Sequence, residues 1–505
     1  MSTGAHGEAA QVSAAYGSAA ATMERARPLS ARRGRALLAA LVLLTADWLT
    51  VCACLAVVWW LRAVAAEAVF PGLGPVQGLR DTFADVYALV PWTIAFAGAR
   101  FYTHRALFWD EVRRALYACT VATLWALALS FAARRAGNLS RLIIAGLWGT
   151  AVVAVPLVRY HCKRLLAAAG LWHNRVLIIG GGESGVQVCE RVVANPDLGY
   201  APVAFVDDDE QKIGSQLAGL PVLGPLAATP QLIRALDVRH VIMALPGMAR
   251  EPMLHLVSSC EGHVESIRLV PDLIGFASAG VEAEDLDGVL LLHMRWNLAR
   301  PWNLLVKRSF DLVVATAAAL LLAPLWLAAA LAIRIDSPGP IFFVQERLGR
   351  DRRPFRCIKF RTMFVDGDER LRRHLAAHPE SRTEWERYAK LRSFDPRLTR
   401  PGRVLRRLSL DELPQLINVF HGDMSLVGPR PYLPAETQRM GDFAETVLKA
   451  SPGITGLWQV SGRNQLPFTQ RLRLDEHYVR NWSLWLDAVV LVQTLGAVLR
   501  RRGAY

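Results

Sequence analysis

Long runs of hydrophobic residues dominate the first third of the chain. A helix needs about 20 consecutive apolar residues to cross a membrane, and four runs approach that length. They cover residues 36–61, 84–99, 115–133 and 142–158. The second run is short and is interrupted by a proline. The pattern predicts a membrane-embedded α-helical bundle over residues 36–160, after a disordered tail over residues 1–35 that is rich in small and polar residues.

Basic side chains flank these runs unevenly. Lys and Arg gather before the first run, between the second and third, and after the fourth. These residues are Arg25, Arg27, Arg32, Arg33, Arg35, Arg100, Arg105, Arg113, Arg114, Arg159, Lys163 and Arg164. The remaining two loops are less basic, although Arg134 and Arg135 reduce the contrast. Because cytoplasmic loops carry the excess of basic residues, we predict that the N-terminus and everything after Arg159 lie in the cytoplasm.

Residues 175–292 alternate short apolar strands with helical patterns, which is typical of an α/β domain with a parallel sheet. A turn with Gly180, Gly182 and Gly185 follows the first strand, and Asp207 ends the second. This context predicts a Rossmann-like fold, and it makes these four residues candidate cofactor-binding residues. Such domains also serve as regulatory or assembly surfaces. None of the ten Tyr residues is followed four positions later by Lys, which argues against redox chemistry on a sugar.

A fifth apolar run covers residues 312–333 and has Pro324 near its middle. Eleven Lys or Arg residues lie in residues 334–373, a density that favours the cytoplasmic side. A re-entrant hairpin bent at Pro324 enters and leaves the membrane on one side, so both of its flanks stay cytoplasmic. An ordinary kinked spanning helix is the alternative. Near the C-terminus, polar residues interrupt the apolar stretch at residues 482–499, which predicts an interfacial amphipathic helix.

Composition agrees with a membrane protein that handles anions. Hydrophobic residues make up 52% of the 505 residues, and the formal net charge is +14. A soluble protein of this length is seldom so apolar, and in a membrane protein the basic excess fits anionic lipid or a phosphate-rich substrate. No two of the seven Cys residues have the spacing of a zinc or redox site, which predicts reduced thiols.

Residues with catalytic chemistry are concentrated after residue 300. Alternation over residues 355–360 predicts a strand that presents Arg356, Lys359 and Arg361. On its own, this basic face would indicate only contact with anionic lipid headgroups. Two further turns carry a rigidly held cation, because X-Pro bonds restrict the backbone around it. The candidate substrate-binding residues in these turns are Pro429, Arg430, Pro431 and Arg463.

An acidic pair, Asp411 and Glu412, follows Ser409 and precedes a Leu-Pro step. Proline is favoured in the first helical turn, so a helix that starts near Leu413 places both carboxylates at its N-terminus, where phosphate oxygens bind well. One carboxylate could attack phosphorus while the other helps to hold Mg²⁺. The alternative is a capping box between Ser409 and Glu412, in which the acids only stabilise the helix start.

Together these motifs resemble the bacterial sugar transferase family, the polyprenyl-phosphate hexose-1-phosphate transferases. The matching strings are SPGP at 337–340, KFRTM at 359–363, SLDELPQ at 409–415, MSLVGPRP at 424–431, PGITGLWQVSGR at 452–463 and GAY at 503–505. They lie in residues 301–505, and the preceding regions match the large polytopic branch of the family. The insert at residues 366–392 resembles the undecaprenyl-phosphate galactose phosphotransferases.

The resemblance implies a monotopic catalytic domain on a re-entrant helix, at the cytoplasmic face of a bacterial inner membrane. It implies that Asp411 is the nucleophile and that Asp411 and Glu412 bind Mg²⁺. The reaction then has two steps: a UDP-sugar loses UMP as its phosphosugar is bonded to Asp411, and the phosphosugar passes to undecaprenyl phosphate. The family positions associated with the phosphates and the nucleotide match Lys359, Arg406 and Arg430.

Galactose 1-phosphate is the expected group, and glucose 1-phosphate is the alternative, since no residue that we can name reads the hydroxyl that distinguishes them. The product would initiate exopolysaccharide, capsule or O-antigen synthesis. A membrane nucleotide-sugar dehydratase and a non-catalytic assembly scaffold are two less favoured functions. The expected partners are a UDP-sugar, undecaprenyl phosphate and the membrane, without nucleic acid. A homodimer, the ligand of the middle domain and the polysaccharide served are left open.

Overall fold

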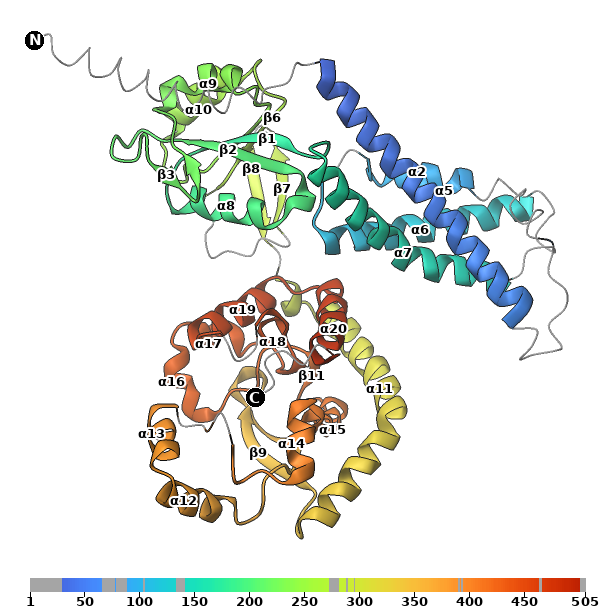
Figure 1. The fold of residues 1–505 in the computed structure, drawn as a ribbon, viewed down its shortest axis with the longest axis vertical. Helices are drawn as coiled ribbons and strands as arrows, with labels where there is room; N and C mark the ends of the chain where they lie inside the picture. The colour runs from blue at the N-terminus through green and yellow to red at the C-terminus, as the bar shows by residue number, and fades with distance from the viewer. Residues whose placement is uncertain are drawn as a thin grey trace, which may run out of the picture. The chain divides into compact units, whose positions relative to one another are not determined.

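The computed structural model describes most of the chain and divides it into two compact units, Met1–Ile274 and Gly275–Tyr505 (Figure 1). The described residues are 30–65, 78, 89–102, 105–132, 141–271, 281–287, 289–294, 296–388, 391, 394–462 and 466–499. Residues 1–29 of the predicted N-terminal tail and the candidate residue Arg463 lie outside them. Residues 30–35, also predicted as disordered tail, instead form the first turns of a helix, so that part of the prediction is wrong.

The first unit begins with helices rich in apolar residues. They are α2 (Ser30–Trp60), which continues as a π-helical turn η1 (Leu61–Ala65), α5 (Leu89–Gly98), α6 (Phe108–Ala132) and α7 (Arg141–Ala168). Among the described residues, Leu37–Val64 and Leu142–Ala168 are long and apolar enough to cross a membrane. The first and fourth predicted runs are therefore confirmed as apolar helices of spanning length, and α5 and α6 fall within or over the second and third.

Two of the basic residues that follow the fourth apolar run lie inside helix α7. The side chains of Arg159 and Lys163 are buried there. Arg159 forms ion pairs with Asp47 at 2.6 Å and Glu111 at 2.7 Å, and Lys163 pairs with Glu111 at 2.7 Å. Both cations follow the apolar run at residues 142–158, as predicted, but helix α7 continues past them to Ala168, and each buried charge has a partner.

The rest of the first unit is an α/β layer structure. Its sheet has the order β2-β1-β5-β6 with parallel pairing, which confirms the parallel sheet that the sequence predicted. The strands are β1 (Asn174–Ile179), β2 (Tyr200–Val206), β5 (His240–Met243) and β6 (Ser266–Leu269), and the helices are α8 (Glu183–Ala194), α9 (Thr229–Ala235) and α10 (Arg250–Cys260). Figure 1 shows α8 on one face of the sheet and α9 and α10 on the opposite face.

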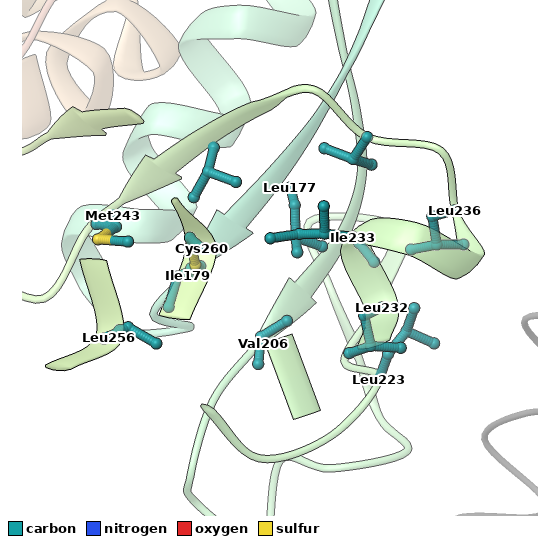
Figure 2. Packing of buried hydrophobic residues seen from close by; sticks show 13 residues of the cluster. Leu177, Ile179, Val206, Leu223, Leu232, Ile233, Leu236, Met243, Leu256 and Cys260 are labelled. Atoms are coloured by element: carbon teal, nitrogen blue, oxygen red, sulfur yellow. The ribbon is translucent and has the colours of Figure 1, made fainter. Parts of the chain in front are cut away.

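Alternating strand residues supply the two cores of this layer structure. Leu177 and Ile179 of β1 point to the face that α9 and α10 cover, where they pack with Ile233 and several more buried apolar residues (Figure 2). Ile178 and Phe205 point to the opposite face and pack near α8. This alternation follows from the two-residue repeat of a strand, and it explains why the strands read as continuous apolar runs.

The second unit has small sheets surrounded by helices. Its strands are β7 (Val281–Leu286) with β8 (Val289–Met294), β9 (Phe342–Leu348) with β10 (Pro354–Phe360), both antiparallel, and β11 (Ser425–Val427) parallel to β12 (Gly453–Thr455). Its helices are α11 (Pro301–Asp336), α12 (Gly367–Ala377), α13 (Pro379–Tyr388), α14 (Arg400–Arg407), α15 (Gln415–His421), α16 (Thr437–Met440), α17 (Phe443–Val447), α18 (Leu457–Ser461), α19 (Phe468–Arg480) and α20 (Leu484–Leu499). The strand predicted at residues 355–360 is confirmed as β10.

Helix α11 is continuous over 36 residues, although Pro324 lies inside it. A proline in a helix interior removes one hydrogen bond and bends the axis, and Figure 1 shows α11 as a bent helix. The structure therefore has one bent helix where the family resemblance implied two helices separated by a break. Its length and apolar composition also make it a candidate membrane helix.

Helix α20 packs into the unit through residues that the sequence assigned to a polar face. Asp487 is fully buried, and its carboxylate accepts hydrogen bonds from Lys307, Tyr478 and Trp482. Val490 belongs to the same hydrophobic core as Tyr478 and Trp482. Asp487, one of the polar residues that interrupt the apolar stretch at residues 482–499, therefore does not face water, because its charge is matched inside the protein.

Candidate active site

The acidic pair lies in a short turn between α14 and α15. Ser409 has a left-handed backbone with φ of 56°, and the 3₁₀ turn η7 (Leu410–Glu412) follows it. Helix α15 begins at Gln415, two residues after the predicted start, with Pro414 in the N-cap position. A capping box requires the Ser409 side chain to accept a hydrogen bond from a backbone N–H of the helix. Ser409 makes no such bond, so the capping-box interpretation is wrong.

Asp411 is partly withdrawn from solvent and surrounded by charge. Burial and then the neighbouring Glu412 carboxylate raise the pKa of Asp411 to about 6, while Lys359 and Arg406 act in the opposite direction. Burial penalises the ionised form and a like charge does the same, whereas nearby cations favour it. Asp411 is therefore mostly ionised at neutral pH but more basic than an exposed aspartate.

Two predicted cations lie beside the acidic pair. The Lys359 ammonium, on strand β10, is 2.8 Å from Glu412 Oε1. Arg406, in the last turn of α14, donates from Nε to Thr362 Oγ1 at 2.9 Å. Burial lowers the pKa of Arg406, and the charge of Asp411 partly offsets that shift. Strand β10, the end of α14 and the turn η7 thus bring four of the predicted residues together.

The structure does not bring Arg361 to the acidic pair. Its guanidinium donates to the carbonyl oxygens of Ser337 at 2.6 Å and Pro338 at 3.0 Å, and its side chain is buried. Strand β10 ends at Phe360, so the two-residue alternation that would have aligned Arg361 with Lys359 no longer applies. Arg361 fixes the turn that follows α11.

The loop formed by residues 428–431 presents a second group of cations. The Arg430 backbone N–H donates to Asp475 Oδ2 at 3.1 Å, and Arg347 Nη1 donates to the carbonyl oxygen of Pro431 at 3.1 Å. The Trp458 ring lies near two guanidiniums, with its centroid 5.7 Å from Arg430 Cζ and 5.3 Å from Arg471 Cζ. Pro429 is buried and Pro431 is partly buried in this loop.

We call Arg347, Arg430 and Arg471 the arginine cluster. Their positive charges lie close enough to repel one another. Burial and then the Arg430 charge lower the pKa of Arg347, and the same two causes lower the pKa of Arg471. The Glu412 charge acts in the opposite direction and raises the pKa of Arg347. Clustered cations that repel one another form a favourable site for a polyanion.

Sequence reasoning missed two of these arginines and one acid. Neither Arg347 nor Arg471 lies in one of the strings that match the family, and nothing in the spacing of the chain points to them. Asp475 is buried, accepts hydrogen bonds from the Arg430 N–H and the Tyr432 hydroxyl, and thereby holds the loop. Burial raises the pKa of Asp475 to about 7. These contacts join segments far apart in the chain, so only the fold shows them.

In the first unit, the glycine-rich turn is explained by packing. Gly180 has φ of 101°, and a Cβ at Gly185 would lie 1.9 Å from the Gly180 carbonyl oxygen. Asp207 Oδ2 accepts a hydrogen bond from the Gly181 N–H at 2.6 Å. Gly182 precedes α8 in the N-cap position. The structure therefore brings the four predicted cofactor-binding residues together. The Asp207 carboxylate already accepts the hydrogen bond of one backbone N–H of the turn, that of Gly181.

Comparison with known proteins matches both parts of the chain. Residues 302–501 match the bacterial sugar transferase family, and residues 101–271 match a CoA-binding domain family. A UDP-galactose-lipid carrier transferase of Erwinia amylovora is 36% identical over 408 residues, which cover 80% of this chain and 84% of that protein.

Two further relatives differ in the share of the chain that they match. The exopolysaccharide production protein ExoY of Rhizobium meliloti is 44% identical over 206 residues, which are 41% of this chain and 91% of that protein. A UDP-glucose:undecaprenyl-phosphate glucose-1-phosphate transferase of Xanthomonas campestris is 32% identical and covers 70% of this chain and 72% of that protein. The acidic pair and the arginine cluster all lie inside the matched residues 302–501.

Proposed function

The chain belongs to the bacterial sugar transferase family, and from that premise we propose that it transfers hexose 1-phosphate from a UDP-sugar to undecaprenyl phosphate. The group is galactose 1-phosphate, and glucose 1-phosphate is the second candidate, because relatives with both donors in their names align over most of the chain. The observation that carries the proposal is the Asp411–Glu412 pair with the charges of Lys359 and Arg406 close to it. The reaction begins the synthesis of a surface polysaccharide.

In the proposed first step, an Asp411 carboxylate oxygen bonds to the sugar-side phosphorus of the donor. The bond from that phosphorus to the bridging oxygen breaks, and UMP leaves with the oxygen. In the second step, an oxygen of undecaprenyl phosphate attacks the same phosphorus and displaces Asp411. This order fits a partly buried carboxylate whose raised pKa makes it a better nucleophile than an exposed one.

The cations supply the charge neutralisation that phosphoryl transfer needs. Lys359 and Arg406 flank the nucleophile and act on the phosphoryl group under attack. The arginine cluster binds the second phosphate, which becomes the phosphate of UMP, and the Trp458 face lies beside it. We therefore assign Arg347 and Arg471 to donor binding together with Arg430.

The acidic pair also suits Mg²⁺. This ion is usually held by one or two carboxylates together with waters and substrate phosphates, and two adjacent carboxylates are present here. Within the described part of the chain no three His, Cys, Asp or Glu residues gather as a metal site. Lys359 already contacts one oxygen of Glu412. Asp411 and Glu412 would thus hold Mg²⁺ when the donor diphosphate is bound, and the ion would neutralise its charge.

Helix α11 supports the re-entrant arrangement that we propose for the membrane. Ala315, on its N-terminal half, packs in one core of the second unit, and Ile333, on its C-terminal half, packs in another. Leu320 and Leu321, between them, are 74% and 80% exposed. Because both halves contact one folded unit, the exposed apolar middle can enter the membrane while both ends stay on the cytoplasmic face.

Cysteine labelling in sealed membrane vesicles tests this topology. We expect Trp302→Cys and Ile335→Cys, at exposed positions near the two ends of α11, to react with an impermeant maleimide from the same, cytoplasmic side. Leu320→Cys should be protected until detergent is added. The unsubstituted chain gives the background from native thiols. Labelling of the two ends from opposite sides would show that α11 spans the membrane.

The pH dependence of the rate tests the electrostatics around Asp411. An ionised carboxylate is required for attack, so kcat/KM should rise about tenfold per pH unit below pH 6 and level off above it. Lys359→Met removes a charge that lowers the pKa of Asp411, so the rising limb should move to higher pH. Glu412→Gln removes a charge that raises it, so the limb should move to lower pH. Identical limbs in all three proteins would contradict the assignment of the nucleophile.

The direct test of the function is release of UMP by the detergent-purified chain. UDP-galactose and UDP-glucose are supplied in parallel, with Mg²⁺ and undecaprenyl phosphate. Release of more than one UMP per chain should depend on the lipid, because only the lipid frees Asp411 for another round. Such release, faster with one donor, supports the transferase and identifies the sugar. Nicotinamide cofactor bound to the purified protein, without UMP release, would favour the dehydratase, and folded protein that acts on neither donor would favour the scaffold.

A further inference from the structure

A buried ammonium group connects the membrane helix α11 to the strand that leads into the arginine cluster. Lys307 is 7% exposed. Its Nζ donates to Asp487 Oδ2 at 2.7 Å, to the carbonyl oxygen of Val427 at 3.1 Å and to the Tyr478 hydroxyl at 3.3 Å. An ammonium group has three N–H donors, so each of them has an acceptor.

The acceptors of Lys307 are themselves fixed. The Tyr478 hydroxyl lies 2.8 Å from the Val427 carbonyl oxygen and 2.7 Å from Asp487 Oδ1, and the Trp482 indole donates to Asp487 Oδ2 at 3.0 Å. One turn further along α11, Asp311 accepts from the Ser425 hydroxyl at 2.7 Å. Two residues of α11 thus hold both ends of the three-residue strand β11.

Strand β11 continues directly into the loop that carries Arg430. Val427 is its last residue, and residues 428–431 follow without a spacer. Close packing leaves this junction little freedom, because a Cβ at Gly428 would lie 2.5 Å from the Ser451 carbonyl oxygen. The loop is therefore anchored by Lys307 at its start and by Asp475 at the Arg430 N–H.

We infer that Lys307 is a positioning residue, which fixes the Val427 carbonyl and thereby sets the position of Arg430. Anion binding at Arg430 then depends on the position of helix α11 relative to strand β11. This inference rests on the proposed function, since it concerns the donor phosphate site. A buried ion pair adds little net stability, because desolvation of its charges offsets their attraction. A network kept only for stability would leave the affinity of the anion site unchanged once the protein is folded.

A double-mutant cycle on UMP binding tests the inference. The full-length chain in detergent is titrated with UMP by calorimetry as the wild type, Lys307→Met, Arg430→Ala and the double variant. We expect Lys307→Met to weaken UMP binding about tenfold and to have no further effect when Arg430 is already absent, as for two coupled residues. Arg308→Met is the matched control, because Arg308 lies on the same helix but donates to carbonyls of Val419 and Phe420. Its loss should not be coupled to Arg430.

Thermal melting of each variant shows whether it is folded. Should Lys307→Met fail to fold, Asp487→Asn replaces it, because the amide keeps the shape of the side chain while weakening the hold on Lys307. Additive losses in the cycle, or unchanged UMP affinity in a folded Lys307 variant, would overturn the inference. UMP binding requires no transfer, so absence of UMP release from a UDP-sugar counts against the proposed function and not against the positioning role.

Discussion

Replacement of Asp411 by asparagine is expected to slow UMP release from the donor by at least about 1,000-fold, because an amide cannot form the covalent bond to phosphorus. The UMP affinity should not fall, since the arginine cluster is unchanged. Intact-mass measurement gives an independent readout. The wild type, given donor and Mg²⁺ without the lipid, should gain the mass of one hexose phosphate, and Asp411→Asn should gain none.

Asp442→Asn is the matched control for this variant. Asp442 is an exposed aspartate at the start of α17, so the same chemical change there should leave the rate within about twofold, as is usual for surface substitutions. Substantial UMP release by folded Asp411→Asn would show that the lipid phosphate attacks the donor directly. UMP release by Asp411→Asn together with a hexose phosphate bonded to another residue would show that this other residue is the nucleophile.

The sequence predicted features that depend on local patterns. The two-residue alternation at residues 355–360 is observed as β10, and the strand that ends before Gly180 is observed as β1. The acidic pair was found because its residue types and the adjacent Pro414 are close together in the chain. These predictions succeed since hydrophobic periodicity and turn chemistry act over a few residues.

Features that depend on distant contacts were missed or misread. Arg361 matched the strand pattern but turns to the carbonyls that follow α11, and Asp487 looked like a surface residue but pairs with Lys307, 180 positions earlier. Arg159 was identified only as a basic residue that flanks the fourth apolar run, and it lies in a buried ion network. In each case a charge is satisfied by a partner far away in sequence, and periodicity carries no information about such partners.

Removal of Mg²⁺ with a chelator is expected to lower UMP release by at least about 100-fold, because two carboxylates otherwise face the negatively charged donor without a divalent cation. Restoring Mg²⁺ in excess should restore the rate. Glu412→Gln should require a higher Mg²⁺ concentration for half-maximal rate, since one of two carboxylate ligands is lost. Measured rates over a Mg²⁺ titration, for the wild type and this variant, check both expectations.

Stability provides the control for the Mg²⁺ experiment. Since the described residues include no group of three metal-ligating acids, His or Cys, the ion should bind mainly with the donor, and the chelator alone should leave the melting temperature unchanged. Full activity after exhaustive chelation would mean that Lys359 and Arg406 neutralise the transferred phosphoryl group by themselves. The ion pair between Lys359 and Glu412 would then be the working state of the site, and Glu412 would serve to orient Lys359.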